Sequence, residues 1–183
     1  MLALLAPLPL PACSCPSLPV GCLPQPAHPL PPCRLPQAVQ VQLQRGERAD
    51  KQDDSPVTVA DYGAQALVAW SLLRAFPGRP LSLVAEEDAA ELRAPGGGAM
   101  LERITELVNA ALTEVLPGSS GLTPGQVADL VDAGGSRGGP VGRHWVLDPI
   151  DGTRGFVGMR QYAVCLGLLE EGKVRQRWWG GVC

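Results

Sequence analysis

The stretch "WVLDPIDGTRGF", residues 145–156, decides the fold and the chemistry that we expect of this chain. A run of β-type apolar residues ends in Asp148, and a second carboxylate, Asp151, follows three positions later. The intervening Pro149 and Ile150 predict a turn that brings the two carboxylates to the same side. Carboxylates this close repel one another and raise each other's pKa, so a divalent cation between them is the simplest way to keep both ionised.

Two more acidic groups occupy similar positions. Asp61 stands near the start of a predicted helix, and Glu86 and Glu87 follow a predicted strand over residues 81–85. Loops that leave strand ends are where sites are built in mixed sheets. Because these ligands are hard oxygens with no His or Cys nearby, they favour Mg²⁺ over zinc.

The residues around the second aspartate suit a phosphate. The Ile150 carbonyl is left free as a neutral ligand, and Gly152 and Thr153 present backbone N–H groups at a possible helix start, suited to cradling an anion. Simpler interpretations stay open for each piece alone: "DPIDG" as a structural turn, "EED" as a solvated face and Asp61 as a helix cap. A D-x-D-G-T phosphatase motif with a nucleophilic aspartate is disfavoured, since the aspartates here are three apart.

Composition limits the class of protein. The 183 residues carry a net charge of -3 and are 45% hydrophobic, enough for one domain with a core. No stripe of Lys and Arg is present to neutralise phosphates, and prolines interrupt the early apolar run, so we expect neither a nucleic-acid nor a membrane partner. The cysteines lack zinc-site spacing and imply no disulfide framework, and Cys165 is expected as a small buried hydrophobe.

The first 46 residues differ from the rest. They hold no Asp or Glu, and eleven of the 19 prolines fall within residues 1–36, so this part is predicted to be a disordered leader without a core. A cleaved transit peptide, a plain tail and an error in the gene model all remain open. A chloroplast or mitochondrial location is one expectation, and the cytoplasm is the alternative.

The remainder mixes helices and strands without a regular βαβ alternation, which predicts an α+β fold or a layered α/β sandwich. Residues 59–76 should form a helix with Thr58 as N-cap and one apolar face, which holds Tyr62, Ala66, Leu67, Trp70, Leu73 and Phe76. Further elements are expected as helices over residues 99–116 and 123–135, the latter capped by Thr123, and as strands over residues 144–148 and 161–174, with a hairpin turn at 170–173.

Three motifs together are far more specific than any one alone. "DDSPVTVADYGAQ", "VAEED" and "WVLDPIDGTRGF", in that order, resemble the lithium-sensitive, Mg²⁺-dependent phosphatases of the inositol monophosphatase superfamily. The chain looks most like the 3'(2'),5'-bisphosphate nucleotidases, or PAP phosphatases, of plants and algae, because "SPVTVAD" and the Arg-Gly-Phe after "DGT" favour that branch. The resemblance covers about residues 50 to 174.

The resemblance implies a role for each matching residue. Glu86, Asp148, the Ile150 carbonyl and Asp151 match metal ligands, with Asp148 bridging two of the two or three Mg²⁺ ions of the full-length family. Asp61, paired with the Thr153 hydroxyl, matches the group that activates the attacking water, and Gly152 and Thr153 match phosphate-contacting amides. Arg154 either meets a second phosphate or solvates the rim, and Glu87 is expected behind the ligands.

The implied reaction removes the 3'-phosphate of adenosine 3',5'-bisphosphate (PAP), or of its sulfated relative PAPS, by activated water without a covalent intermediate. An inositol (poly)phosphate phosphatase and a catalytically incomplete fragment are the alternatives, and the oligomeric state stays open.

The chain also departs from the family pattern. We expect a Pro-rich leader over residues 1–46, the N-terminal part of the phosphatase domain over 47–174 and an unrelated tail over 175–183 that exposes Trp178 and Trp179. "QAVQVQLQ" is only a remnant of the family's first helix. These departures predict a truncated or mis-assembled product whose sheet has an unpaired edge and an uncovered apolar face.

Overall fold

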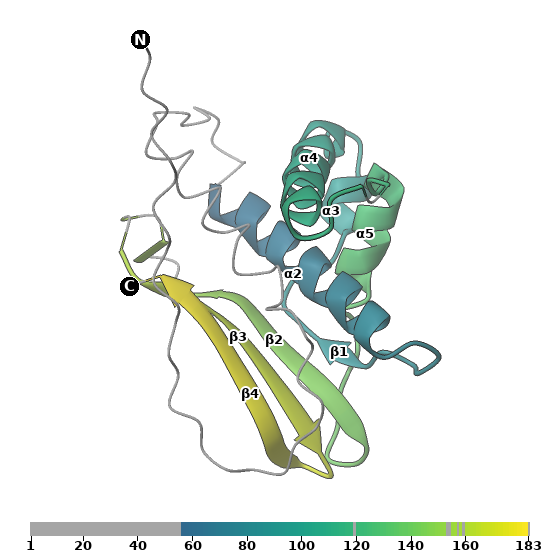
Figure 1. The fold of residues 1–183 in the computed structure, drawn as a ribbon, viewed down its shortest axis with the longest axis vertical. Helices are drawn as coiled ribbons and strands as arrows, with labels where there is room; N and C mark the ends of the chain where they lie inside the picture. Colours follow the sequence, from purple (N-terminus) through teal and green to yellow (C-terminus); the bar gives the residue numbers. More distant parts are fainter. Residues whose placement is uncertain (1–55, 119, 153–154, 157, 159, 183) are drawn as a thin grey trace.

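The computed structural model describes residues 56–118, 120–152, 155–156, 158 and 160–182, and the predicted leader lies outside them (Figure 1). The elements follow one another as α2 (Pro56–Ala75), β1 (Leu83–Val84), α3 (Ala90–Arg93), α4 (Gly98–Val115), α5 (Pro124–Asp132), β2 (Arg143–Asp151), β3 (Tyr162–Glu170) and β4 (Lys173–Val182).

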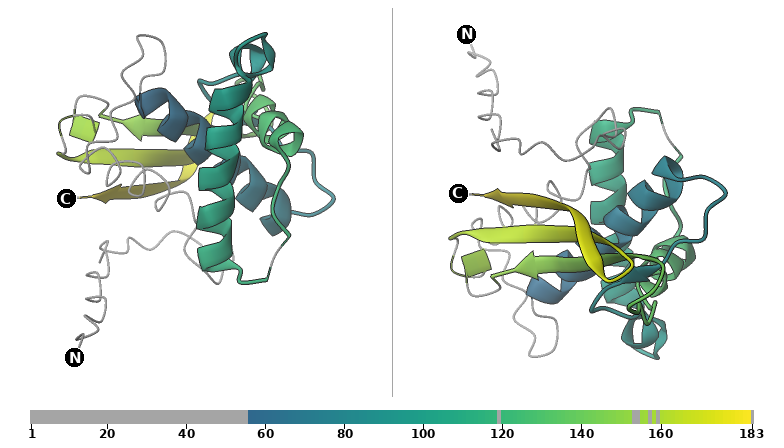
Figure 2. Two further views of the ribbon diagram at one scale, coloured as in Figure 1. Left: turned by 90° about the horizontal axis from the view of Figure 1, so that it is seen from above. Right: turned by 90° about the horizontal axis from the view of Figure 1, so that it is seen from below.

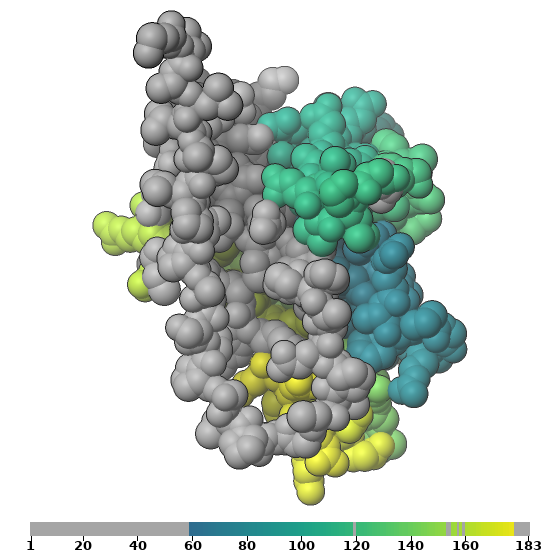
Figure 3. All heavy atoms as spheres, in the orientation of Figure 1, coloured from purple at the N-terminus to yellow at the C-terminus, as the bar shows by residue number. Residues whose placement is uncertain are grey.

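The four strands form one mixed sheet in the order β1-β2-β3-β4. Strand β1 runs parallel to β2, while β2, β3 and β4 are joined antiparallel. Helix α2 lies against the sheet, and α4 and α5 pack on the other side of α2 (Figures 1 and 2). In the space-filling view, the atoms of α4 and α5 lie in contact beside those of α2 (Figure 3). This layered arrangement confirms the predicted α+β class.

Helix α2 is the central layer and is buried on more than one face. All of residues 62–69 are buried, with Leu67 packed towards α4 and α5 and Val68 packed towards the sheet. The prediction of a single apolar face was therefore wrong, and Leu73, which we had placed on that face, is 43% exposed. The buried alanines at positions 60, 64, 66 and 69 have small side chains, so both layers can approach the helix closely.

The start of α2 also differs from the prediction. The helix begins at Pro56, so Thr58 lies inside the first turn instead of capping it, and Asp61 falls in the second turn. Proline suits the first helical positions because its fixed φ is already helical and its missing N–H would have no partner there. Asp61 is thus not a helix cap, which removes the simplest structural explanation for that carboxylate.

The other two long helices follow the predicted pattern. On α4 the buried residues recur at three- and four-residue spacing, including Ile104, Leu107, Val108 and Ala111. At the start of α5 the Thr123 side chain accepts from the Gln126 backbone, and the Gln126 side chain accepts from the Thr123 N–H. This capping box satisfies two backbone donors that the helix itself leaves without partners. Helix α3 was not predicted from the sequence. None of the described helices combines the length and the apolar composition that a bilayer crossing requires.

The C-terminal hairpin extends further than expected. The turn between β3 and β4 lies at residues 171–172, within the predicted "EEGK", and both residues have positive φ. Strand β4 then continues to Val182, and the backbones of Trp178 and Trp179 pair with β3. Residues 175–182, which we had expected as a tail, therefore belong to a strand, because the long apolar strand β3 offers a ladder that β-forming residues extend.

Candidate functional site

The pairing of β1 with β2 sets the frame of the site. Leu83 pairs with Trp145 and Val84 with Val146 in parallel register, so both strands point the same way. Glu86 and Asp148 each stand two residues beyond the Val84–Val146 pair. Since parallel strands end at the same edge of a sheet, the two acids leave that edge next to each other. Burial raises the pKa of Asp148, and the charge of Glu86 is the next cause of this rise.

A β-bulge near the end of β2 brings the second aspartate to the same side as the first. Asp148 pairs with Cys165 and Asp151 with Ala163, so three steps along β2 match only two along β3. Such a bulge re-aims the side chains that follow it. The Ile150 side chain is 3% exposed in the core, while Asp151 is exposed. The predicted turn is thus a bulge within the strand, and Asp148 and Asp151 pair with residues two apart on β3, which lie on one face of that strand.

The turn that follows is built around Gly152. Its φ of 95° lies in the left-handed region that favours glycine. Its carbonyl accepts from the N–H groups of Gly155, at 2.7 Å, and Phe156, at 3.0 Å. The ring of Phe156, fully buried, meets Tyr162 edge-on at 5.0 Å between centroids, which anchors the turn. Thr153 and Arg154 lie outside the described residues, so their roles stay predictions.

Asp61 faces this acidic edge from the second turn of α2. Its pKa is raised to about 8, by burial first and then by the charges of Glu87, Asp148 and Glu86, in that order of importance. Three segments far apart in the sequence therefore bring their carboxylates into one electrostatic neighbourhood. All four causes raise the pKa, so among the described residues no cation compensates the cluster at Asp61.

The pKa values of the neighbouring acids Glu87 and Asp148 are also raised. Burial, followed by the charge of Glu86, raises the pKa of Glu87, although a hydrogen bond from the Tyr62 hydroxyl opposes this. Burial also raises the pKa of Asp148, followed by Glu86 and Asp151, and the Ile150 N–H donates to its carboxylate and opposes the rise. A bound cation would reverse the repulsive contributions.

The side chains at this edge are of the chemical type that binds Mg²⁺. Every acidic group at this edge offers carboxylate oxygens, which hard divalent cations prefer. Within the described part of the chain, no three acidic, His or Cys side chains are yet arranged closely enough to hold an ion. The cluster therefore supplies the charge and the type of ligand that Mg²⁺ prefers.

Cys165 lies beside these carboxylates and not in the core, where we had expected it. Its Sγ donates to Asp151 Oδ2 at 3.9 Å, and the side chain is only half-buried. Burial raises the pKa of the thiol, and the charges of Asp151 and Asp148 add to this. The reason is the alternation of β3, whose neighbouring residues Val164 and Leu166 take the core face.

Sequence reasoning missed Gln65 and Tyr62, both on α2. Gln65 is fully buried, and its side-chain amide makes three hydrogen bonds, two of them to the backbone of Glu87. Tyr62 hydrogen-bonds the Glu87 carboxylate. A polar amide one helical turn after Asp61, inside the apolar run "AQALVAW", was the available signal.

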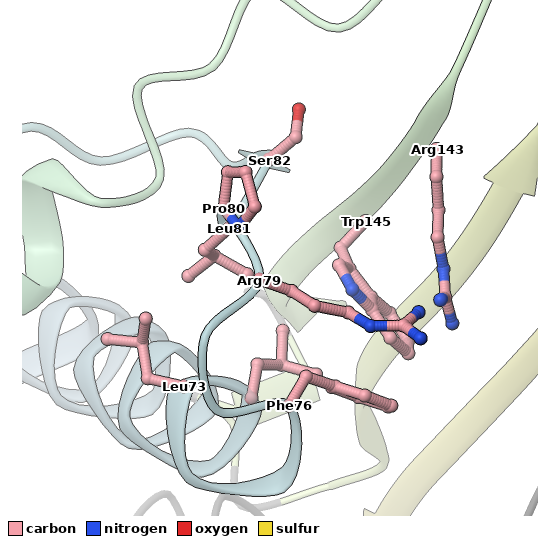
Figure 4. Close-up of a pocket in the computed structure, with 9 residues that line it drawn as sticks. Leu73, Phe76, Arg79, Pro80, Leu81, Ser82, Arg143 and Trp145 are labelled. Carbon is pink, nitrogen blue, oxygen red and sulfur yellow. The ribbon is translucent and has the colours of Figure 1, made fainter.

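A separate pocket lies at the opposite end of β2, away from the carboxylates (Figure 4). Its lining includes Phe76, Arg79, Arg143 and Trp145. The Arg143 guanidinium lies 5.3 Å from the Phe76 ring centroid and 5.9 Å from that of Trp145. Its Nε also lies 3.4 Å from Glu170 Oε1, so this cation is already engaged within the fold.

Comparison with known proteins agrees with this geometry. The model of the inositol monophosphatase family matches residues 37–175. The 3'(2'),5'-bisphosphate nucleotidase 1 of Arabidopsis thaliana is 55% identical over 142 residues, which are 77% of this chain and 40% of that protein. The 3'(2'),5'-bisphosphate nucleotidase of Oryza sativa is 50% identical over 142 residues, with the same two shares. The chain thus spans about 40% of the length of these curated relatives. The resemblance read from the three motifs is confirmed: the chain belongs to the inositol monophosphatase family.

Proposed function

We propose that this chain carries the Mg²⁺-binding and water-activating part of a phosphomonoester hydrolase that removes the 3'-phosphate of PAP. The observation that carries the proposal is the convergence of Asp61, Glu86 and Asp148, whose charges act on one another across three separate segments. The names of the relatives, which are bisphosphate nucleotidases, support the substrate class.

In this proposal, Glu86, Asp148, Asp151 and the Ile150 carbonyl hold the metal. When bound, the ion supplies positive charge that lowers the pKa of water and neutralises charge developing on the phosphoryl oxygens. Three of these four ligands are carboxylates, and the bulge between Asp148 and Asp151 supports a shared role for two of them.

Asp61 is the proposed proton acceptor. With a pKa of about 8 it holds its proton at neutral pH while the acidic edge lacks a cation. A neighbouring positive charge favours the ionised carboxylate, which can then take the proton of the attacking water. The pairing of Asp61 with the Thr153 hydroxyl, and the phosphate contacts of Gly152, Thr153 and Arg154, are part of the same proposal.

The test uses the purified 183-residue protein. Phosphate release is measured from PAP and from inositol 1-phosphate with Mg²⁺, with and without Li⁺, and Mg²⁺ binding is followed by calorimetry. Release from PAP that Asp148→Asn abolishes, and that Glu102→Gln on the exposed surface of α4 leaves intact, supports the proposal. Preference for inositol 1-phosphate would overturn the substrate, and a chain without Mg²⁺ binding would overturn the site.

A further inference from the structure

We propose that Gln65 is a positioning residue that holds the Glu86–Glu87 loop on helix α2 at a set distance from Asp61. This inference rests on the proposed function, because it concerns the residues that would hold the metal there.

The hydrogen bonds of Gln65 join three segments. Its Oε1 accepts from the Glu87 N–H at 3.1 Å, and its Nε2 donates to the Glu87 carbonyl at 2.6 Å and to the Val131 carbonyl at 2.8 Å. A side-chain amide has two donor hydrogens and one acceptor oxygen, so every polar group of Gln65 is used. The fully buried amide therefore ties α2 to the loop after β1 and to the end of α5.

The hydrogen bonds from Gln65 to the Glu87 backbone also restrict the position of Glu86. With both its N–H and its carbonyl held, the backbone at Glu87 has little freedom to rotate, and Glu86 is the residue directly before it. The Tyr62 hydroxyl adds a third point of attachment through the Glu87 carboxylate. The contacts of Glu87 thus fix the position of the loop, and Glu86 is the residue of this loop that would bind the metal.

The same helix carries Asp61 one turn before Gln65. Residues four apart lie above one another on the same face of a helix. The proton acceptor and the residue that holds the ligand loop therefore belong to one rigid element. Their spacing depends on the helix itself and not on the flexibility of the loop.

Gly134 leaves the space that this arrangement needs. A Cβ added there would lie 2.5 Å from Gln65 Nε2 and 2.9 Å from the Ala85 Cβ. The Gly134 carbonyl accepts from the Ala85 N–H at 2.9 Å. The backbone at Gly134 therefore cannot move away from Gln65 without breaking that hydrogen bond. Gly134→Ala is thus a way to displace the Gln65 amide without changing Gln65.

The experiment compares Gln65→Met, which keeps the length but removes all three hydrogen bonds, with Ser71→Ala. Ser71 is a matched control because it is also buried on α2, and its hydroxyl donates only to Leu67 of the same helix, at 2.7 Å. Mn²⁺ affinity is measured by electron paramagnetic resonance, and exchange of the Glu87 amide hydrogen by NMR, at a temperature where each variant is fully folded.

We expect Gln65→Met to weaken Mn²⁺ binding about 10–100-fold, as loss of a residue supporting metal ligands does, and to speed exchange at Glu87. Ser71→Ala should change neither quantity. If Gln65→Met speeds exchange but binds Mn²⁺ as the unmodified chain does, Gln65 is only structural and the inference is wrong.

A chain that binds no Mn²⁺ at all would instead overturn the proposed function, and the inference with it. Should Gln65→Met not fold, Gly134→Ala decides the question. A loss of Mn²⁺ affinity in that folded variant supports the inference, and unchanged affinity overturns it.

Discussion

Val84 pairs with Val146 in parallel register, and this single pairing makes neighbours of Glu86 and Asp148, which are 62 positions apart in the sequence. The bulge after Asp148 then adds Asp151, and α2 brings Asp61. Like charges gathered in this way oppose folding unless protons or a cation neutralise them. The effect of these charges on stability and on metal affinity can be measured with and without metal.

The stability of the metal-free protein should fall as pH rises from about 4 to about 8. The folded pKa of Asp61 is raised to about 8 from 3.8, so the folded state keeps a proton that the unfolded chain releases within this window. The raised pKa values of Glu87 and Asp148 act in the same direction. Thermal unfolding in a chelator, followed by circular dichroism, measures the effect. Asp61→Asn should flatten it, and an equally steep pH dependence in that variant would contradict the assignment.

Mg²⁺ should stabilise the protein more at pH 8 than at pH 5, because protons compete with the ion for the same carboxylates. At a concentration of 100 Kd, a ligand that binds only the folded state adds about 2.7 kcal/mol to the free energy of unfolding. The shift in Tm on adding MgCl₂ measures this, with NaCl at matched ionic strength as control. Equal shifts with the two salts would indicate screening and no specific site.

Asp148→Asn should change stability and metal binding in opposite directions. Removing this charge relieves repulsion with Glu86 and Asp151, so the metal-free protein should unfold at a higher temperature. The asparagine keeps an oxygen that accepts from the Ile150 N–H. Metal affinity should fall by more than the about 10–100-fold that supporting residues cost. Glu102→Gln removes one exposed charge from α4 and should change neither quantity.

Phe156→Ala should lower the free energy of unfolding by about 3–5 kcal/mol, the usual cost of emptying a buried aromatic site. The Phe156 side chain is fully buried, and its ring packs edge-on against the ring of Tyr162. Urea unfolding followed by tryptophan fluorescence gives the value. Phe156→Leu should cost less, and a loss below about 1 kcal/mol for the alanine variant would contradict this packing.

Thr123→Ala should lower the free energy of unfolding by about 1 kcal/mol through loss of the capping box. The site lies on other elements, so Mn²⁺ affinity should not change. Thr113→Ala is the control, since this exposed hydroxyl bonds only to Asn109 of its own helix. A drop in Mn²⁺ affinity in Thr123→Ala would show that the start of α5 is coupled to the site.

Much of the fold follows from patterns that span only a few residues. The apolar spacing of α4 and the Thr123 cap of α5 could be predicted because a helix depends on contacts three or four positions apart. The hairpin turn at residues 171–172 is equally local. The three acidic motifs could be recognised for the same reason, since each is a short run of letters.

What the sequence determined by itself was therefore the local elements and the family, and it predicted which carboxylates belong to the site. Only the tertiary structure decided that α2 is buried between two layers, that β4 continues to Val182, and that burial with neighbouring charges raises the pKa of Asp61. It alone joined Gln65 to Glu87 and Val131, which are 22 and 66 positions away. The physical reason is that burial, strand pairing and electrostatic repulsion act between atoms close in space, whatever their separation along the chain.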